Sequence, residues 1–259
     1  MTSTFASQVG HLAARSVVRT ARQPANIIGS LAFPMALLAV NSGGLDAATG
    51  LEGFPTDSFV AFALAVPFIQ GALFSTINAG ADLARDIQTG FFNRLSLTPM
   101  RGSALLAGQL AGVVVMGLFQ AVIYLTVGLA VGVEIESGVA GAVVLLVLAA
   151  VIALGFGAIG TFIALRTGSG EAVQGFFPAL FVFLFISSMN MPRDLIPIDW
   201  FRIAATANPV SYLIEGVRSL IITGWNGQAL ALGFGVAIAI TFVAMAASSW
   251  ALKERLART

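Results

Sequence analysis

The chain has 259 residues, of which 58% are hydrophobic and only 10% charged, whereas about a quarter of the residues in an ordinary soluble domain are charged. Its 13 basic and 12 acidic residues give a formal net charge of +1, which excludes the basic surface that nucleic-acid binding requires. There is no cysteine and one histidine, His11, so thiol chemistry, disulfides and cysteine or histidine metal sites are excluded or disfavoured. We therefore expect an all-α polytopic membrane protein of one domain, residues 1–259.

Residues 1–24 form a basic, amphipathic leader. Its apolar and basic positions fall on adjacent arcs of a helix, with Val9, Leu12, Ala13 and Val17 on one and His11, Arg15, Arg19 and Arg22 on the other. The pattern predicts an interfacial helix that either anchors to anionic lipid or also contacts a partner subunit. A signal peptide ending in the apolar run 27–40 is the alternative. Because the leader is long and five stronger apolar segments follow, we expect it to be retained.

Six stretches are long and apolar enough to cross a bilayer core about 30 Å thick as helices. They are residues 25–42, 58–79, 104–133, 138–165, 172–191 and 229–252. The first contains Pro34, where the missing backbone donor predicts a kink. In the third, Gly108 and Gly112 have the small-residue spacing that allows helices within one chain to pack closely.

Positive residues are distributed unevenly between the two sets of connections. On one side fall Arg15, Arg19, Arg22, Arg85, Arg94, Arg101, Arg166, Lys253, Arg255 and Arg258, and on the other only Arg193, Arg202 and Arg218. Because Lys and Arg are retained on the cytoplasmic side, both termini are expected in the cytoplasm. The chain would then be a multi-pass protein of a bacterial plasma (inner) membrane.

The expected spans contain no ionisable residue, although ion-coupled carriers usually keep such groups to bind the driving ion. Their polar residues are neutral and are expected to join helices through hydrogen bonds: Gln70, Asn78, Gln109, Gln120, Gln174 and Asn190. No G-x-x-x-x-G-K-[ST] phosphate loop and no protease-like catalytic cluster occurs. The chain is therefore not expected to be an enzyme by itself, and an ATPase, if one is used, is another chain.

The connection 80–103 is patterned as helix, break, helix. A polar helical stretch covers residues 82–88, Gly90 can supply a left-handed stop, and a second short helix ends at Pro99. Apolar side chains give this segment a greasy surface: Phe91, Phe92, Leu95 and Leu97. They either pack under the membrane domain or form a contact for a cytosolic partner.

The connection 192–228 is too apolar for a free loop and too interrupted by proline for a span. Asn208 followed by Pro209 is an N-cap and first-turn pattern, which predicts a helix over residues 209–223 that lies in or dips into the outer leaflet. On it Glu215 and Arg218 stand three residues apart and are expected to pair with each other. A role of this pair in gating is the alternative.

Two sequence patterns, together with the leader and the six spans, resemble the type-2 ABC exporter permeases over essentially the full chain. The first runs Asp86-Ile-Gln-Thr-Gly90-Phe-Phe-Asn-Arg94-Leu-Ser-Leu-Thr-Pro99, and the second is Met191-Pro192 followed by Asn208-Pro-Val-Ser-Tyr-Leu-Ile-Glu-Gly-Val-Arg218. The order of these patterns along the chain is most similar to that of the daunorubicin-type drug exporter branch. In that branch the R-L-x-x-T-P segment lies in the helix that docks on the ATPase.

The resemblance implies a pair of six-span subunits, identical or homologous, each docked on one of two ABC ATPase subunits that bind ATP and Mg. No cofactor is then expected on this chain, and membrane lipid surrounds it. The implied docking residues are Arg85, Asp86, Gly90, Phe91, Phe92, Arg94, Leu95, Thr98, Pro99 and Arg101. The turn at residues 166–171 is a second expected contact, and the outer re-entrant segment is expected to use Asn208, Pro209, Tyr212, Glu215 and Arg218.

The aromatic content favours a hydrophobic or amphiphilic cargo, because 20 phenylalanines stand against three tryptophans and two tyrosines. The resemblance places the second and fifth spans beside the path, where the candidates are Phe62, Phe68, Phe74, Phe177, Phe181 and Phe185. Export of a lipid-linked cell-envelope glycan is the alternative cargo. A membrane scaffold or assembly factor without a transport path, and an uncoupled channel, are the alternatives of other classes.

Overall fold

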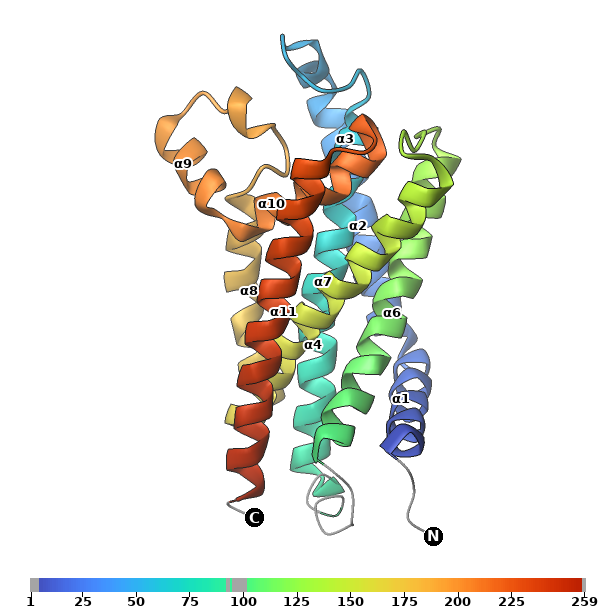
Figure 1. Ribbon diagram of the computed structural model, residues 1–259, viewed down its shortest axis with the longest axis vertical. Helices are drawn as coiled ribbons and strands as arrows, with labels where there is room; N and C mark the ends of the chain where they lie inside the picture. Colours follow the sequence, from blue (N-terminus) through green and yellow to red (C-terminus); the bar gives the residue numbers. More distant parts are fainter. Residues whose placement is uncertain (1–4, 92–93, 95–101, 258–259) are drawn as a thin grey trace.

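The computed structural model describes residues 5–91, 94 and 102–257. Every regular element in this part of the chain is helical (Figure 1). The elements are α1 (Phe5–Ala21), α2 (Pro24–Leu45), η1 (Asp46–Gly50), α3 (Phe59–Ala63), α4 (Ala65–Gln88), α6 (Gly102–Ala130), α7 (Gly138–Thr167), α8 (Gly170–Phe185), η2 (Arg193–Leu195), α9 (Asp199–Ala207), α10 (Pro209–Arg218), η3 (Ser219–Thr223, a π-helix) and α11 (Gly227–Leu256). The predicted all-α class is confirmed.

The long helices run side by side, and both chain termini lie at the same end of the bundle, here called the termini end (Figure 1). α3, α9 and α10 lie at the opposite end, here called the α10 end. α4 is central, because it packs against α2, α6, α7, α8 and α10. One helix therefore reaches both ends of the molecule and contacts most of the others.

Five helical segments are long and apolar enough to cross a membrane: Pro24–Gly50, Phe59–Gln88, Gly102–Ala130, Gly138–Thr167 and Gly227–Leu256. They correspond to five of the six predicted stretches. The remaining one, the fifth predicted stretch at residues 172–191, is the shorter apolar helix α8 of 16 residues. α8 ends early because the side-chain Nδ2 of Asn208 donates to the carbonyls of Phe183 and Ile186, at 2.5 and 2.6 Å. These bonds satisfy carbonyls that a helix C-terminus leaves open.

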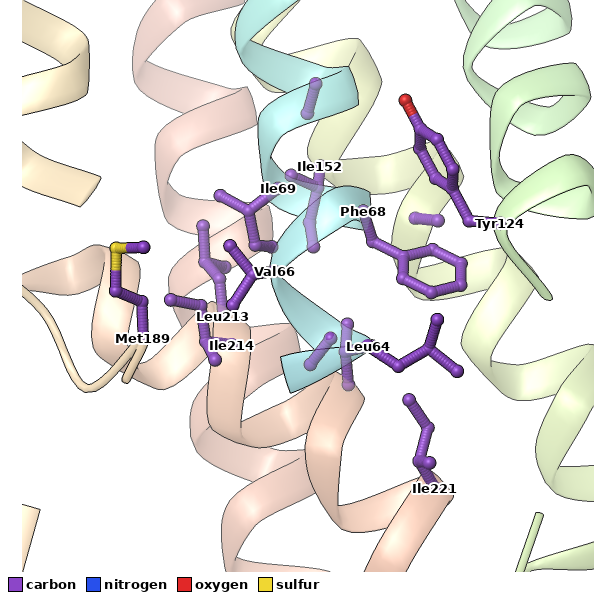
Figure 2. Packing of buried hydrophobic residues seen from close by; sticks show 14 of the residues in the cluster. Leu64, Val66, Phe68, Ile69, Tyr124, Ile152, Met189, Leu213, Ile214 and Ile221 are labelled. Atoms are coloured by element: carbon purple, nitrogen blue, oxygen red, sulfur yellow. The ribbon is translucent and has the colours of Figure 1, made fainter. Parts of the chain in front are cut away.

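The main hydrophobic core surrounds the α10-end half of α4 (Figure 2). Val66 and Ile69 of α4 face Leu213 and Ile214 of α10, and all four side chains are at most 4% exposed. Burial of an aliphatic side chain of this size contributes about 1.5–3 kcal/mol, so this contact binds α10 firmly to α4. The predicted helix over residues 209–223 is confirmed as α10 continued by η3.

Hydrogen bonds between helices use several of the neutral polar residues that the sequence places in the spans. Gln120 donates to the Ser30 hydroxyl at 2.7 Å, and Tyr124 donates to the Ser30 carbonyl at 2.8 Å. The side chain of Gln109 donates to the Ala79 carbonyl at 3.4 Å. The predicted role of these glutamines is confirmed, whereas the fully buried Gln70 amide has no partner among the described residues.

Glycines set the closest helix contacts. A Cβ atom at Gly160 of α7 would lie 1.9 Å from the backbone oxygen of Thr76 in α4. On α6, a Cβ at Gly112 would lie 2.3 Å from the Ser16 hydroxyl, and one at Gly108 would lie 2.4 Å from Cβ of Leu12. The predicted close packing at the Gly108 and Gly112 pair is therefore confirmed, and its partner is α1.

Candidate functional site

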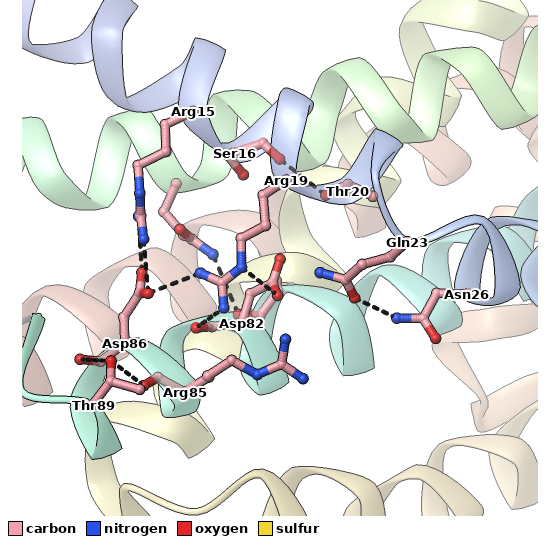
Figure 3. Close-up of polar contacts among 12 residues, drawn as sticks. Arg15, Ser16, Arg19, Thr20, Gln23, Asn26, Asp82, Arg85, Asp86 and Thr89 are labelled. Carbon is pink, nitrogen blue, oxygen red and sulfur yellow. Dashed lines mark hydrogen bonds and ion pairs between the residues drawn. The ribbon is translucent and has the colours of Figure 1, made fainter.

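Two arginines of α1 and two aspartates of α4 form an ion cluster at the termini end (Figure 3). Arg15 donates two hydrogen bonds to the Asp86 carboxylate, from Nη1 to Oδ2 at 3.0 Å and from Nη2 to Oδ1 at 2.9 Å. Arg19 donates a hydrogen bond from Nη1 to the same carboxylate at 2.8 Å, and its Nε lies 3.1 Å from Oδ1 of Asp82. The four charges cancel, so the cluster fixes α1 to α4 without leaving a net charge.

The cluster also offsets the dipole of α4. Asp82 and Asp86 lie near the C-terminal end of α4, where the helix already carries partial negative charge. The arginines of α1 compensate for the aspartate charges and for the partial negative charge of the helix end. The hydrogen bonds to Asp86 raise the pKa of Arg15. Arg85 lies on another face of α4 and its side chain is exposed (Figure 3).

The predicted coupling segment begins where α4 ends. The helix expected over residues 82–88 is not a separate element but the end of α4, and Gly90 has φ of +69°, which confirms the left-handed stop. The guanidinium of Arg15 lies 4.0 Å from the centre of the Phe91 ring, a cation–π distance. Arg94 is exposed. The remaining predicted docking residues lie outside the described part: Phe92, Leu95, Thr98, Pro99 and Arg101.

The turn between α7 and α8 contacts the same end of α4. Gln88 donates through Nε2 to the Gly168 carbonyl at 3.1 Å. The neighbouring Arg166 forms an ion pair with Glu254 near the end of α11. The two segments predicted as partner contacts, residues 80–103 and 166–171, are therefore joined to each other at the termini end.

Phenylalanines from three helices form a second cluster, here called the aromatic cluster: Phe33 of α2, Phe74 of α4, and Phe177, Phe181 and Phe185 of α8. Ring centres of Phe74 and Phe177 lie 5.2 Å apart, and those of Phe177 and Phe181 lie 4.7 Å apart. The cluster is half-buried as a whole, and Phe33 and Phe185 are 45% and 51% exposed. It is therefore an apolar surface that the helices leave partly uncovered.

Two of the predicted path residues lie elsewhere. Phe62 is fully buried beside Phe54 and Phe59, and Phe68 is buried against Tyr124. The structure thus brings four of the six predicted phenylalanines together and places these two in the hydrophobic core, so they do not share the exposed surface.

At the α10 end, Arg218 is buried and donates to three backbone carbonyls. Its Nε, Nη1 and Nη2 lie 3.0 Å from the carbonyl oxygens of Phe62, Ser188 and Met189, respectively. Its guanidinium also lies 3.5 Å from the centre of the Phe62 ring. Burial lowers the pKa of Arg218 to about 9, so the group keeps its charge at pH 7.

The predicted pairing of Glu215 with Arg218 is wrong. The Glu215 carboxylate accepts from Nη2 of Arg193 at 2.6 Å, and the Arg193 guanidinium lies over the Tyr212 ring at 4.5 Å. Arg193 belongs to η2 and stands 22 residues before Glu215 in the sequence, so a more distant partner replaces the neighbour three residues away. Asn208 and Pro209 have their predicted positions, with the Asn208 side chain accepting from the backbone of Val210.

Comparison with known protein families matches residues 7–222 to the family of the ABC-2 type transporter. The match covers well over half of the chain. The chain belongs to this family. It is also similar to the daunorubicin resistance ABC transporter permease protein DrrB1 of Streptomyces coeruleorubidus, with 29% identity over 170 residues, which are 64% of this chain and 59% of that protein. The chain is thus aligned to less than two thirds of the length of this relative.

Family membership and the apolar helices together make this ABC-2 transporter chain a multi-pass membrane protein. Sequence reasoning missed three features of its candidate site. The pairing of Arg15 and Arg19 with Asp82 and Asp86 joins residues more than 60 positions apart, and only the opposite charges on two amphipathic faces hinted at it. Helix α9 (Asp199–Ala207) and the Phe33 ring were also missed, because proline-rich flanks and a mid-span Pro34 obscured their roles.

Proposed function

We propose that this chain is the membrane-spanning permease subunit of an ATP-driven exporter. Two copies, or one copy and a homologue, would pair, and two separate ABC ATPase subunits would bind ATP and Mg. Family membership supports this assignment, and the relative's name states an ABC transporter permease of drug resistance. The chain itself contributes no phosphate loop, so hydrolysis would occur on the partner.

One observation carries the mechanism: a single helix connects the three regions of the site. α4 has 24 residues, about 36 Å of helix at 1.5 Å per residue. It carries the aspartates of the ion cluster at one end, Phe74 of the aromatic cluster near its middle, and the contact to α10 at the other end. A displacement imposed on the segment after Gln88 would therefore reach the aromatic cluster and α10 through one stiff element.

The ion cluster would make this coupling efficient. Because Arg15 and Arg19 tie α1 to the last turns of α4, and Gln88 ties α4 to the α7–α8 turn, the end of α4 cannot move alone. The termini end would therefore move as one unit when the ATPase subunits close.

Gly90→Val tests this coupling. A β-branched residue resists the positive φ at this position, so the segment after Gln88 should be misdirected and the ATPase should dock poorly. Gly235→Val is the matched control, since a Cβ there meets open space. Phe92→Asp and Leu95→Asp should likewise weaken docking. Normal co-purification of the ATPase and unchanged export by Gly90→Val would contradict the proposal, and lack of any ATPase partner would favour a scaffold.

The proposed cargo is a hydrophobic or amphiphilic compound taken from the cytoplasm or inner leaflet. The aromatic cluster supports this class, because it offers several partly exposed rings from α2, α4 and α8 and no charged side chain among them. Burial of such a ring against a cargo molecule is worth about 1.5–3 kcal/mol. A glycan would find no hydrogen-bonding group on these rings.

The cargo class is tested by substrate-stimulated ATPase activity of the reconstituted complex. Phe177→Ala combined with Phe181→Ala should raise the half-maximal concentration of a lipophilic stimulator about tenfold or more, since 1.4 kcal/mol corresponds to a factor of ten. Phe242→Ala on α11 is the control, as that ring is 74% exposed and outside the cluster. Stimulation by a soluble oligosaccharide carrier, with no response to any lipophilic compound, would overturn the cargo class and leave the permease assignment standing.

We further propose that the termini end faces the cytoplasm, because most Lys and Arg residues lie in the connections of that side. The chain has no cysteine, so single cysteines can be labelled selectively in intact cells. An impermeant maleimide should label Asp46→Cys and not Arg94→Cys. The reverse labelling would invert the orientation.

A further inference from the structure

A cavity of about 320 Å³ opens at the α10 end, between the segment before α3 and the helices α10, η3 and α11. This volume falls within the range of small-molecule sites. Polar and charged groups make up much of its wall, together with one ring: Phe62, Arg193, Asp194, Glu215, Arg218 and Asn226. None of these residues has a place in the coupling mechanism described above.

One buried cation of the wall, Arg218, has no carboxylate within ion-pair distance in the described part of the chain, although the charge of Glu215 acts on it from farther away. Glu215 is occupied by Arg193 at 2.6 Å, and Asp194 is exposed, where water screens its charge. Arg218 is 5% exposed and makes no ion pair among the described residues. Three of its N–H groups donate to carbonyls, and a guanidinium has five, so two donors remain on a group that lines the cavity.

A buried cation is stabilised far better by an anion than by carbonyl dipoles alone, because the local dielectric is low. A planar guanidinium with two remaining donors matches the oxygens of a phosphate group. A cation, by contrast, would meet the charge of Arg218 and would find the Glu215 carboxylate already engaged. The wall carries two arginines and two carboxylates, and next to Arg218 it favours an anion over a cation.

The position of the cavity identifies a source of such anions. α11 begins at Gly227, and its N-cap Asn226 lines the cavity; the α3–α4 span begins nearby at Phe59. The ends of spans lie at the level of the lipid headgroups. Trp200 and Trp225, at 64% and 58% exposed, fit the aromatic belt expected at the same level.

We propose that this cavity binds a phosphate group through Arg218, presented either by a phospholipid headgroup or by a free phosphate ion. The Phe62 ring holds the guanidinium in place from one side, and the three carbonyls fix its plane. A bound phosphate would join η3 and α11 to α10 through one charge. This site does not depend on the proposed export function, since it requires neither the ATPase nor a cargo.

The test measures binding to the purified full chain in neutral detergent by the rise in thermal unfolding temperature and by native mass spectrometry. The probes are dihexanoyl phosphatidylglycerol, inorganic phosphate, and dihexanoylglycerol, which lacks the phosphate. Thr223→Trp places a large side chain at the exposed rim of the cavity and leaves the Arg218 side chain itself unchanged, and Arg218→Gln removes the cation. Arg202→Gln is the control, because Arg202 pairs with Asp199 and does not line the cavity.

Wild type and Arg202→Gln should bind the phospholipid, dihexanoylglycerol should not bind, and Thr223→Trp and Arg218→Gln should bind the phospholipid at least tenfold more weakly. If inorganic phosphate raises the unfolding temperature as much as the phospholipid does, the free ion is the source of the phosphate and the site is supported. If Arg218→Gln fails to fold, Thr223→Trp decides alone. Binding that dihexanoylglycerol matches, or that survives unchanged in Thr223→Trp, would overturn the proposal.

Discussion

The two ends of the α3–α4 span (Phe59–Gln88) contact arginines in different ways. At the termini end, Arg15 and Arg19 are neutralised by the carboxylates of Asp82 and Asp86. At the α10 end, Arg218 donates to backbone carbonyls and lies over the Phe62 ring, with no carboxylate within ion-pair distance among the described residues. The side chains of the ion cluster retain some contact with water, whereas the carbonyls that bind Arg218 belong to two buried segments, at residues 62 and 188–189.

This difference indicates that the two ends of the α3–α4 span have different roles. The ion cluster holds α1 to α4 through side chains that keep some contact with water, which suits a region that moves as one unit. Arg218 is a permanent tie among the carbonyls at residues 62, 188 and 189, which belong to segments far apart in the sequence. Substitutions that remove one partner at each end should therefore differ in the size and kind of their effects.

The largest effect is expected from Arg218→Gln. It leaves buried carbonyls without donors, and each buried acceptor left unsatisfied costs about 1–3 kcal/mol. Arg218→Lys should recover only part of this, since an ammonium cannot match the fixed fork of a guanidinium. Thermal unfolding of the purified chain in detergent measures both. Near wild-type stability for Arg218→Gln would show that Arg218 is not a structural tie.

A smaller effect is expected from Asp86→Asn, because Arg15 keeps 38% of its side chain exposed and can be solvated. Loss of the hydrogen bonds to a charged group should weaken the attachment of α1 by about 1.5–3 kcal/mol. Asp82→Asn should cost less, since Asp86 pairs with both arginines. The measurement is the rate of proteolytic cleavage after α1, with Arg85→Gln as control. If Asp86→Asn and wild type are cleaved after α1 at the same rate, the ion cluster has no role in the coupling mechanism.

The smallest effect is expected from Glu215→Gln. Both side chains of its pair with Arg193 are partly exposed, at 24% and 22%, and such pairs contribute about 0–1 kcal/mol. The unfolding temperature should therefore change little, while that of Arg218→Gln falls clearly. A large loss in Glu215→Gln would mean that Glu215 also stabilises the charge of Arg218, against the contrast drawn between the two ends.

The sequence predicts the features that depend on local rules. Gly90 ends α4 with a positive φ and Asn208 caps α10, as their residue types and neighbours indicate. Apolar length identifies five spans. The same local reasoning overestimates the fifth predicted stretch, because the bonds that end α8 come from Asn208, more than 20 residues further along the chain.

The features that depend on distant partners are not visible in one sequence. The rule for residues three apart pairs Glu215 with Arg218, yet it takes no account of Arg193, which the fold brings closer. The ion cluster likewise requires α1 to lie close to α4. The phenylalanines of the predicted path divide between core and surface because Phe62 and Phe68 pack against Phe54, Phe59 and Tyr124, which are distant in sequence from α8.

The crossing of α4 and α7 has a consequence for which sequences the fold accepts. At position 160 even a methyl group would overlap the Thr76 backbone oxygen, at 1.9 Å, and the Thr76 hydroxyl is already bonded to the Phe156 carbonyl at 2.9 Å. Neither helix can retreat without breaking that bond. Related sequences should therefore keep glycine at position 160. At Gly175, where a Cβ would meet open space, they should accept other residues.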